Sequence, residues 1–384
     1  MDFGFTDDQL RIKRMAREFA EREIAPKVAE YDREERFPIE IARKMGELGM
    51  LGGVVPEQYG GAGMDYISLT LLVEEIARHC QSLGTICSFA SGLAGSGLLH
   101  YGSEAQKERY LAPMARGEIF AGAGVTEPHS GTDVAAMETT AVRDGDSYIV
   151  NGAKIWISNL EYGSWFISFA QMDKSKRHKG ITAFVFPKNT PGLSVRPIRN
   201  KLGFRPLSTG DLIFDNCRIS VENRVGEEGQ GFAVAMASVE NGRLGVAARA
   251  CGVMQACMDE SVRYAKERIV FEQPIGRFQL VQSKITDMVV GLETARFLTY
   301  RLAWVKDQGA KRARPESSMA KMYATDTLMK VSTDAAQIFG AYACSDEYPV
   351  GRHFRDAKFF QVVEGTSELH RMLIAEYTMG YRQD

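Results

Sequence analysis

The segment 362–368 (Val-Val-Glu-Gly-Thr-Ser-Glu) holds the residue types best suited to acid–base chemistry in this chain. Its first carboxylate, Glu364, follows two valines and precedes Gly365, which allows a ligand or another backbone to come close. A carboxyl group buried in apolar surroundings and away from positive charge has a raised pKa, which suits a general base. The alternative is a loop carboxylate with no catalytic role.

The next residues could present hydrogen-bond donors to an anion. Thr366–Glu368 precede a periodic apolar stretch, 369–377, that predicts a helix. Amides and hydroxyls at the start of a helix can bind an anion. The alternative is that these residues only cap the helix.

Four further clusters could contribute to a binding site. They are Val125–Asp133, Lys154–Asn159, Arg268–Gly276 with Gln279 beyond it, and Gln337–Gly340 followed by 346–350 and 355–358. The first is dense in turn formers and hydroxyls, so it predicts either a structural turn or a polar loop that binds a heterocycle. In the second, Trp156 is either a core residue or the backing of an aromatic cofactor, with the Ser158 hydroxyl two residues later.

Length, charge and composition narrow the class of protein. The 384 residues allow two or three domains, and the net charge of −2 gives no electrostatic reason to expect a nucleic-acid partner. No apolar run reaches the roughly 18 residues of a membrane helix, and the acidic N-terminus predicts neither a signal nor a transit peptide. The six cysteines and six histidines show no metal-ligand spacing, so we expect no metal. Free thiols are typical of the cytoplasm, the expected location.

Helical periodicity dominates both ends of the chain, and a β-rich stretch separates them. Residues 1–120 predict a helical domain, with Thr6 as an N-cap, a break at Pro26, and amphipathic helices over 38–51 and 68–80. Residues 121–232 predict a β domain, with strands near 147–150, 166–170, 181–186, 193–195 and 212–214 and a turn signal at Asn151–Gly152. Residues 233–384 predict a four-helix bundle, with helices over 242–268, 279–308, 315–340 and 369–377.

The four clusters and the Glu364 segment, in this order and spacing, resemble the acyl-CoA dehydrogenase family over essentially the whole chain, and most of all its short-chain and cyclic acyl-CoA members. The resemblance implies a mainly α fold with a central β-barrel or sandwich domain between an N-terminal helical domain and a C-terminal four-helix bundle. It implies FAD-dependent α,β-dehydrogenation of an acyl-CoA thioester to the 2-enoyl-CoA. Glu364 matches the base that removes the α-proton, while flavin N5 takes the β-hydride.

The resemblance also implies binding residues. Those matching the flavin site of the same subunit are Ala123, Val125, Thr126, Thr132, Trp156, Ile157, Ser158, Thr366 and Glu368. Those matching a contact with the FAD of a neighbouring subunit are Arg268, Phe271, Gln279, Gln337, Ile338, Gly340 and Ala341. Those matching the substrate site are Ser88, Ser91, Thr132, Glu240, Arg243, Val363 and Gly365.

Some departures from the family pattern bear on these roles. Certain members carry the base at the position of Gly242, which has no side chain here, so Glu364 stands alone as the candidate. Glu272 replaces a usual glycine, and 341–343 read Ala-Tyr-Ala in place of Gly-Asn-Gly. Both departures lie near the expected contact between subunits.

The expected substrate is a short branched or cyclic acyl group. The segment 85–94, which matches the floor of the acyl pocket, carries no charge, and Gly84 stands where glutaryl-type relatives have an arginine. A buried carboxylate without a partner is costly, so a dicarboxylyl group is disfavoured. Val363 replaces a common tyrosine and leaves room beside the reacting carbons.

The family resemblance implies further partners. They are an electron-transferring flavoprotein as electron acceptor and further copies of this chain, most commonly in a tetramer. Two alternatives keep the fold, namely action on a carrier-protein-bound acyl group and reoxidation by oxygen as an acyl-CoA oxidase. The remote alternative is a non-catalytic helical scaffold.

Overall fold

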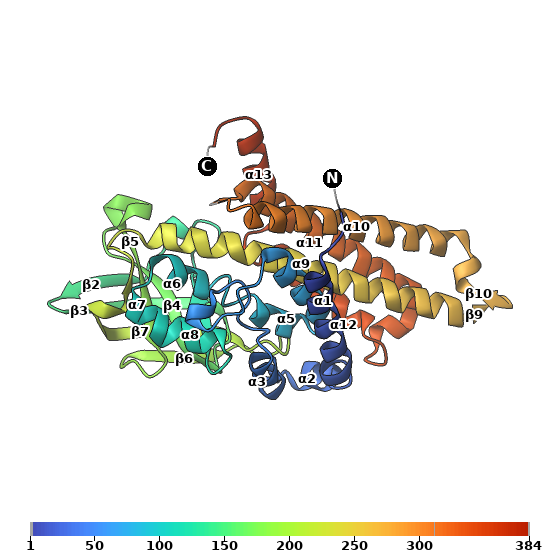
Figure 1. The fold of residues 1–384 in the computed structure, drawn as a ribbon, viewed down its shortest axis with the longest axis horizontal. Helices are drawn as coiled ribbons and strands as arrows, with labels where there is room; N and C mark the ends of the chain where they lie inside the picture. Colours follow the sequence, from blue (N-terminus) through green and yellow to red (C-terminus); the bar gives the residue numbers. More distant parts are fainter. Residues whose placement is uncertain (1–2, 311, 383–384) are drawn as a thin grey trace.

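The computed structural model describes residues 3–310 and 312–382. Helices at both ends of the chain flank a central sheet (Figure 1). This order confirms the predicted fold class, mainly helical with β structure in the middle of the chain.

The N-terminal helices begin and end largely where the sequence predicts. The Thr6 hydroxyl caps the first helix in a capping box with Gln9, and Pro26 lies in the turn that follows a π-helical segment. The two predicted amphipathic helices are present as α3 and α4. The bounds are α1 (Asp7–Phe19), α2 (Val28–Glu34), α3 (Ile39–Glu47), α4 (Tyr66–Ala77), α5 (Gln81–Cys87), α6 (Gly95–Tyr101), α7 (Glu104–Gln106) and α8 (Ala112–Ala115).

The sheet has the strand order β6-β7-β3-β2-β4-β5-β8, with β1 beside β4. Its strands are β1 (Phe120–Gly124), β2 (Thr140–Asp144), β3 (Ser147–Ser158), β4 (Gly163–Gln171), β5 (Ile181–Pro187), β6 (Leu193–Pro197), β7 (Thr209–Ser220) and β8 (Arg224–Val225). Alternate residues of β4 enter two cores, because side chains on a strand point to opposite faces. Phe166 packs with residues of β3 and β7, whereas Ile167 packs with residues of the helices.

One turn prediction is wrong. Asn151–Gly152 lies inside β3, which continues to Ser158, and the pairing with β7 shifts register at Gly152. A second register shift lies between Lys154 and Ile157, where Trp156 has a left-handed φ of 62°. Such bulges turn a side chain out of the regular alternation of the strand.

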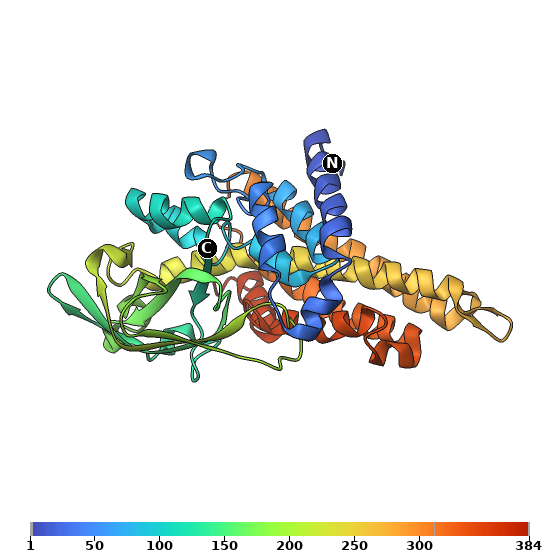
Figure 2. The same cartoon turned by 90° about the horizontal axis from the view of Figure 1, so that it is seen from below.

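The C-terminal helices are α9 (Gly231–Glu267), α10 (Gln279–Asp307), α11 (Arg314–Phe339), α12 (Val350–Val362) and α13 (Ser367–Thr378), and a hairpin of β9 (Ile269–Val270) and β10 (Gln273–Pro274) joins α9 to α10. α9 begins earlier than predicted, because its first turns pack Val234 and Ala235 into the core beneath the sheet. It therefore runs from the sheet through the helical body to the hairpin (Figure 2). None of the helices in the described part of the chain combines the length and apolar character that a membrane crossing requires.

Candidate active site

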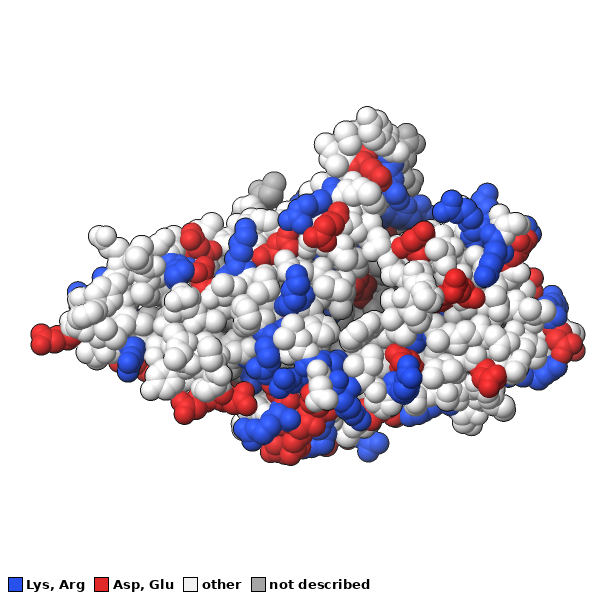
Figure 3. Space-filling model, turned by 180° about the vertical axis from the view of Figure 1, so that it is seen from behind, with Lys and Arg blue, Asp and Glu red and all other residues white. Residues whose placement is uncertain are grey.

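A cavity of about 770 Å³ lies between the sheet, the middle of α9 and the connection from α12 to α13. Its walls come from all three parts of the chain: Ser88 from the N-terminal helices, Trp156 from β3, Arg243 from α9 and Glu364 from the α12–α13 connection. A space-filling view shows a hollow on one face of the molecule, among interspersed basic and acidic side chains (Figure 3). The cavity is thus built by segments far apart in the sequence.

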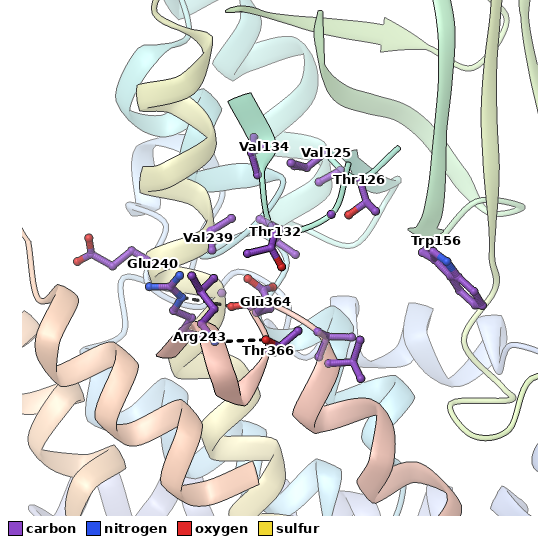
Figure 4. A pocket seen from close by; sticks show the side chains of 18 of the residues that line it. Val125, Thr126, Thr132, Val134, Trp156, Val239, Glu240, Arg243, Glu364 and Thr366 are labelled. Carbon is purple, nitrogen blue, oxygen red and sulfur yellow. Dashed lines mark hydrogen bonds between the residues drawn. The ribbon is translucent and has the colours of Figure 1, made fainter. Parts of the chain in front are cut away.

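Glu364 occupies the connection between α12 and α13 in a left-handed conformation, with a φ of 58°. Its carboxyl group lies on the Cα of Gly242, because a Cβ added there would stand 2.5 Å from Oε1 and 2.6 Å from Oε2. The backbone oxygen of Glu364 accepts a hydrogen bond of 3.3 Å from Arg243 Nε (Figure 4). Oε2 is buried and has no hydrogen-bond partner among the described residues.

Burial raises the pKa of Glu364 to about 7, against the opposing charges of Arg243, Arg249 and Lys321. The expectation of a carboxyl group away from positive charge was therefore wrong, although the direction of the pKa shift is as predicted. None of the three cations forms an ion pair with this carboxylate in the described structure. Lys321 Nζ instead donates to the oxygen of Gly365 at 2.6 Å, and burial lowers the pKa of Lys321 to about 7.

The N-terminus of α13 lies directly beside this carboxylate. Thr366 is its N-cap, with its hydroxyl accepting from the amide of Leu369 at 3.3 Å. Ser367 Oγ donates to Asp326 at 2.6 Å, which ties the first turn to α11. The predicted capping is thereby confirmed, and it fixes the backbone just after Glu364.

The opposite wall belongs to the sheet. Trp156 is 51% exposed and lies across the cavity from Glu364 (Figure 4), so it is not a core residue. The polar loop after β1 is held by an ion pair between Lys154 Nζ and Glu127 Oε1 at 2.6 Å. Both side chains are buried, and burial lowers the pKa of Lys154 to about 8. Sequence reasoning missed this pair, since only the folded strands bring the two residues together.

Most of the expected flavin and substrate residues line the cavity. They are Ser88, Ala123, Val125, Thr126, Thr132, Trp156, Ile157, Ser158, Glu240, Arg243, Val363, Glu364, Gly365 and Thr366. Ser91 does not, because its hydroxyl accepts from the amide of Val54 at 3.2 Å behind the wall. Glu368 is exposed on the first turn of α13 and also lies outside the cavity lining.

The residues expected to reach a neighbouring subunit form a separate group. Arg268, Phe271 and Gln279 are exposed around the β9–β10 hairpin, which lies at the far end of α9 from the sheet (Figure 1). Gln337, Gly340 and Ala341 are exposed at the end of α11, whereas Ile338 is only 7% exposed. Phe339 stacks on Tyr264 with ring centroids 4.1 Å apart, so the two sets share one end of the bundle.

Arg249 is a cavity residue that sequence reasoning did not single out. Its side chain fills the space above Gly84, where an added Cβ would meet Arg249 Cγ at 3.2 Å. A dicarboxylyl group was disfavoured because position 84 carries no arginine, but the structure places the side chain of Arg249 beside that position, so the cavity has a cation there. The sequence did hold a signal for this residue. Arg249 is a charged residue at helical spacing from Gly242 and Gly245, on a face of α9 that is otherwise made of small residues.

Comparison with known proteins gives one consistent family. Models of the N-terminal, middle and C-terminal domains of acyl-CoA dehydrogenases match residues 6–118, 122–217 and 229–379. The chain is 41% identical over 375 residues to the short-chain-specific acyl-CoA dehydrogenase of Clostridium acetobutylicum, covering 98% of this chain and 99% of that protein.

Two solved structures are similar over nearly their full length. A glutaryl-coenzyme A dehydrogenase in complex with glutaryl-CoA has a TM-score of 0.97 at 38% identity, covering 100% of this chain and 98% of that one. A prolyl acyl carrier protein oxidase has a TM-score of 0.94 at 33% identity, covering 98% of this chain and 100% of that one.

Proposed function

The chain belongs to the acyl-CoA dehydrogenase family, and on that premise we propose that Glu364 removes the α-proton of a short acyl-CoA thioester to form the 2-enoyl-CoA. As a member of this family it is an FAD-dependent oxidoreductase. The observation that carries the proposal is a carboxylate inside the cavity with a free oxygen and a pKa near neutrality. A base of that pKa is partly deprotonated at neutral pH and still accepts a proton well.

The cavity residues fit a flavin. The half-exposed indole of Trp156 faces a largely apolar space, where contact with a planar aromatic ring would cover it. The hydroxyls of Thr126 and Ser158 lie on the same wall and would hold the polar edge of the ring. Bound FAD supplies the acceptor for the hydride that leaves the β-carbon.

The chain's own residues carry the proton step. The Glu364 carboxylate takes the α-proton, and its backbone N–H would hold the thioester oxygen on which negative charge develops. Gly242 provides the space for the carboxylate, and Arg243 and Lys321 hold the backbone just after it by donating to the carbonyl oxygens of Glu364 and Gly365. Their positive charges also favour the ionised form of Glu364, so the base is available near neutral pH.

A short branched or cyclic acyl group suits the lining. Phe89, Leu93 and Phe204 close the apolar part of the cavity, and Val363 beside the base is smaller than an aromatic residue. Glu240 and Arg243 lie on α9 at the same wall, where they would meet the pantetheine part of the thioester. The similarity to a short-chain-specific relative supports the same size class.

We also propose an electron-transferring flavoprotein as electron acceptor and a homo-oligomer, a tetramer, as the working assembly. The exposed residues at the hairpin end of the bundle support the second point, because they lie far from the cavity of their own chain. A second candidate function is oxidation of a carrier-bound acyl group, which the similarity to the prolyl acyl carrier protein oxidase favours.

Anaerobic bleaching of the flavin by a panel of acyl-CoA thioesters tests the proposal. Wild type and Glu364→Gln are compared, both loaded with FAD. Bleaching of wild type and not of the variant is expected for short acyl groups. Failure of every acyl-CoA, with bleaching by a carrier-protein thioester, would favour the second candidate, and oxygen consumption would then separate an oxidase from a dehydrogenase.

A further inference from the structure

Arg249 is a buried cation that forms no ion pair in the described structure, although the charge of the Glu364 carboxylate acts on it. Its exposed fraction is 5%, and it lines the cavity. Only neutral groups hold it, since Nη1 donates to Thr85 Oγ1 at 2.6 Å and to Gln81 Oε1 at 3.1 Å. By contrast, the nearby Arg296 forms an ion pair with Glu74. Burying an unpaired charge is costly, so an anion supplied from outside would be bound strongly.

The side chain of Arg249 is oriented toward the base end of the cavity. Its Nε donates to the oxygen of Gly245 at 3.3 Å, so the chain of methylenes runs back along α9. The Glu364 carboxyl group lies against Gly242. This glycine is on the same face of α9 as Arg249, two turns earlier, roughly 10 Å from it along the helix axis. Because the side chain runs back along the helix, the guanidinium lies less than that distance from the base along the axis of α9.

One nitrogen of the guanidinium remains available. Nη2 has no hydrogen-bond partner among the described residues and keeps some accessible surface, so it can reach the cavity that Arg249 lines. Phe360 and Phe204 flank the group, with their ring centroids 5.4 Å and 6.0 Å from Cζ. These contacts fix the plane of the guanidinium and leave one edge free for a ligand.

We propose that Arg249 binds a carboxylate on the acyl group, so that the substrate is a short dicarboxylyl-CoA thioester, branched or substituted. This inference rests on the proposed dehydrogenation. The carboxylate takes no part in the proton or hydride transfer, and it determines which thioester enters. A carboxylate fits better than a hydroxyl or carbonyl because it matches the fork of donors and cancels the buried charge. The spacing to Glu364 places the acid a few bonds beyond the α-carbon.

Matched pairs of thioesters test this proposal in the FAD-loaded enzyme. Each acid is compared with the analogue in which a methyl group replaces the carboxylate: glutaryl-CoA with valeryl-CoA, and methylsuccinyl-CoA with 2-methylbutyryl-CoA. The readout is kcat/KM from anaerobic flavin bleaching. At least one acid should exceed its neutral analogue by about 100-fold in wild type, as expected when a buried charge finds its partner.

Arg249→Gln should bring that ratio to one or below, because glutamine keeps the hydrogen bonding and removes the charge. Lys321→Gln is the matched control, since it removes a different cation near Glu364 and should leave the ratio unchanged. A wild-type ratio at or below one for both pairs would overturn the proposal while the dehydrogenation stands. It would also be overturned if Arg249→Gln slowed both members of a pair equally. If no thioester bleaches the flavin, the proposed function fails first and this inference falls with it.

Discussion

The carboxyl group of Glu364 lies against the Cα of Gly242, in the space that any side chain at position 242 would occupy. The Glu364 carboxyl group can therefore lie there only because residue 242 is a glycine, although one residue belongs to the middle of α9 and the other to the α12–α13 connection. In the proposed mechanism, the absence of a side chain at 242 allows the base to approach the substrate from position 364.

Gly242→Ala should lower kcat/KM by about 100-fold or more. Its Cβ would stand within 2.8 Å of three carboxyl atoms of Glu364 and displace the base, and misplacement of a catalytic group by about 1 Å has an effect of this size. Steady-state kinetics with the best acyl-CoA, at measured FAD content, provide the test. The swapped variant Gly242→Glu/Glu364→Gly should recover at least about tenfold over Glu364→Gly alone. Full activity of Gly242→Ala would contradict the packing described above.

The pH dependence of kcat/KM should follow the ionisation of Glu364. Since burial raises its pKa to about 7 and only the carboxylate accepts a proton, kcat/KM should rise with pH through about 7 and then level off. Arg249 is among the charges that lower this pKa, so Arg249→Gln should move the rise to higher pH with neutral substrates. If kcat/KM has already reached its plateau at about pH 5.5, Glu364 is not the group whose ionisation controls the rate.

Glu364→Gln should also change the pH dependence of stability. A carboxyl group whose pKa is raised by folding binds its proton more tightly in the folded state, so wild type loses stability as pH rises from 4.5 to about 7. The loss is about 3 kcal/mol at most, and the variant lacks it. In thermal melting at a series of pH values, the Tm of the variant should rise relative to that of wild type as the pH increases from 4.5 to about 7. Parallel curves would indicate that the carboxyl group is not desolvated.

The parts of the fold that follow from local sequence were predictable. Thr6 and Thr366 act as caps because the capping hydrogen bonds are made within one turn. Glu364 was found from its own neighbours, the two valines and the glycine. The family resemblance then indicated which cavity residues would accompany it.

The remaining features depend on contacts between distant segments. The register shift that turns Trp156 toward the cavity arises in the pairing of β3 with β7, and Asn151–Gly152 looked like a turn because its strand partner is invisible in the sequence. The arginine beside Gly84 comes from another helix, so the position where relatives carry an arginine could not reveal it. Such contacts leave no pattern in a single sequence.

Trp156→Ala should weaken FAD binding by about tenfold or more. The indole is half exposed, so a flavin ring packed on it would bury a large aromatic surface. Trp156→Phe keeps an aromatic face and should lose less. Flavin retained after repeated ultrafiltration, measured by absorbance, gives the comparison. Equal retention by Trp156→Ala and wild type would place the flavin elsewhere.

Arg268→Ala should lower both FAD content and assembly size. Arg268 lies 26 residues along α9 from Gly242, roughly 39 Å at 1.5 Å per residue, so its side chain cannot serve the flavin of its own cavity. Phe271, beside it on the hairpin, is 84% exposed with a left-handed φ of 51°, an exposure that a neighbouring chain would relieve.

Native mass spectrometry measures both quantities in one experiment. Arg263→Ala is the control, because Arg263 is also a surface arginine near this end of α9 and pairs with Glu260 on its own helix. The control should keep full FAD occupancy and the wild-type assembly, whereas Arg268→Ala should lose part of each. If Arg268→Ala retains one FAD per chain in an unchanged assembly, the hairpin does not reach a neighbour's cofactor, and its exposed Phe271 requires another explanation.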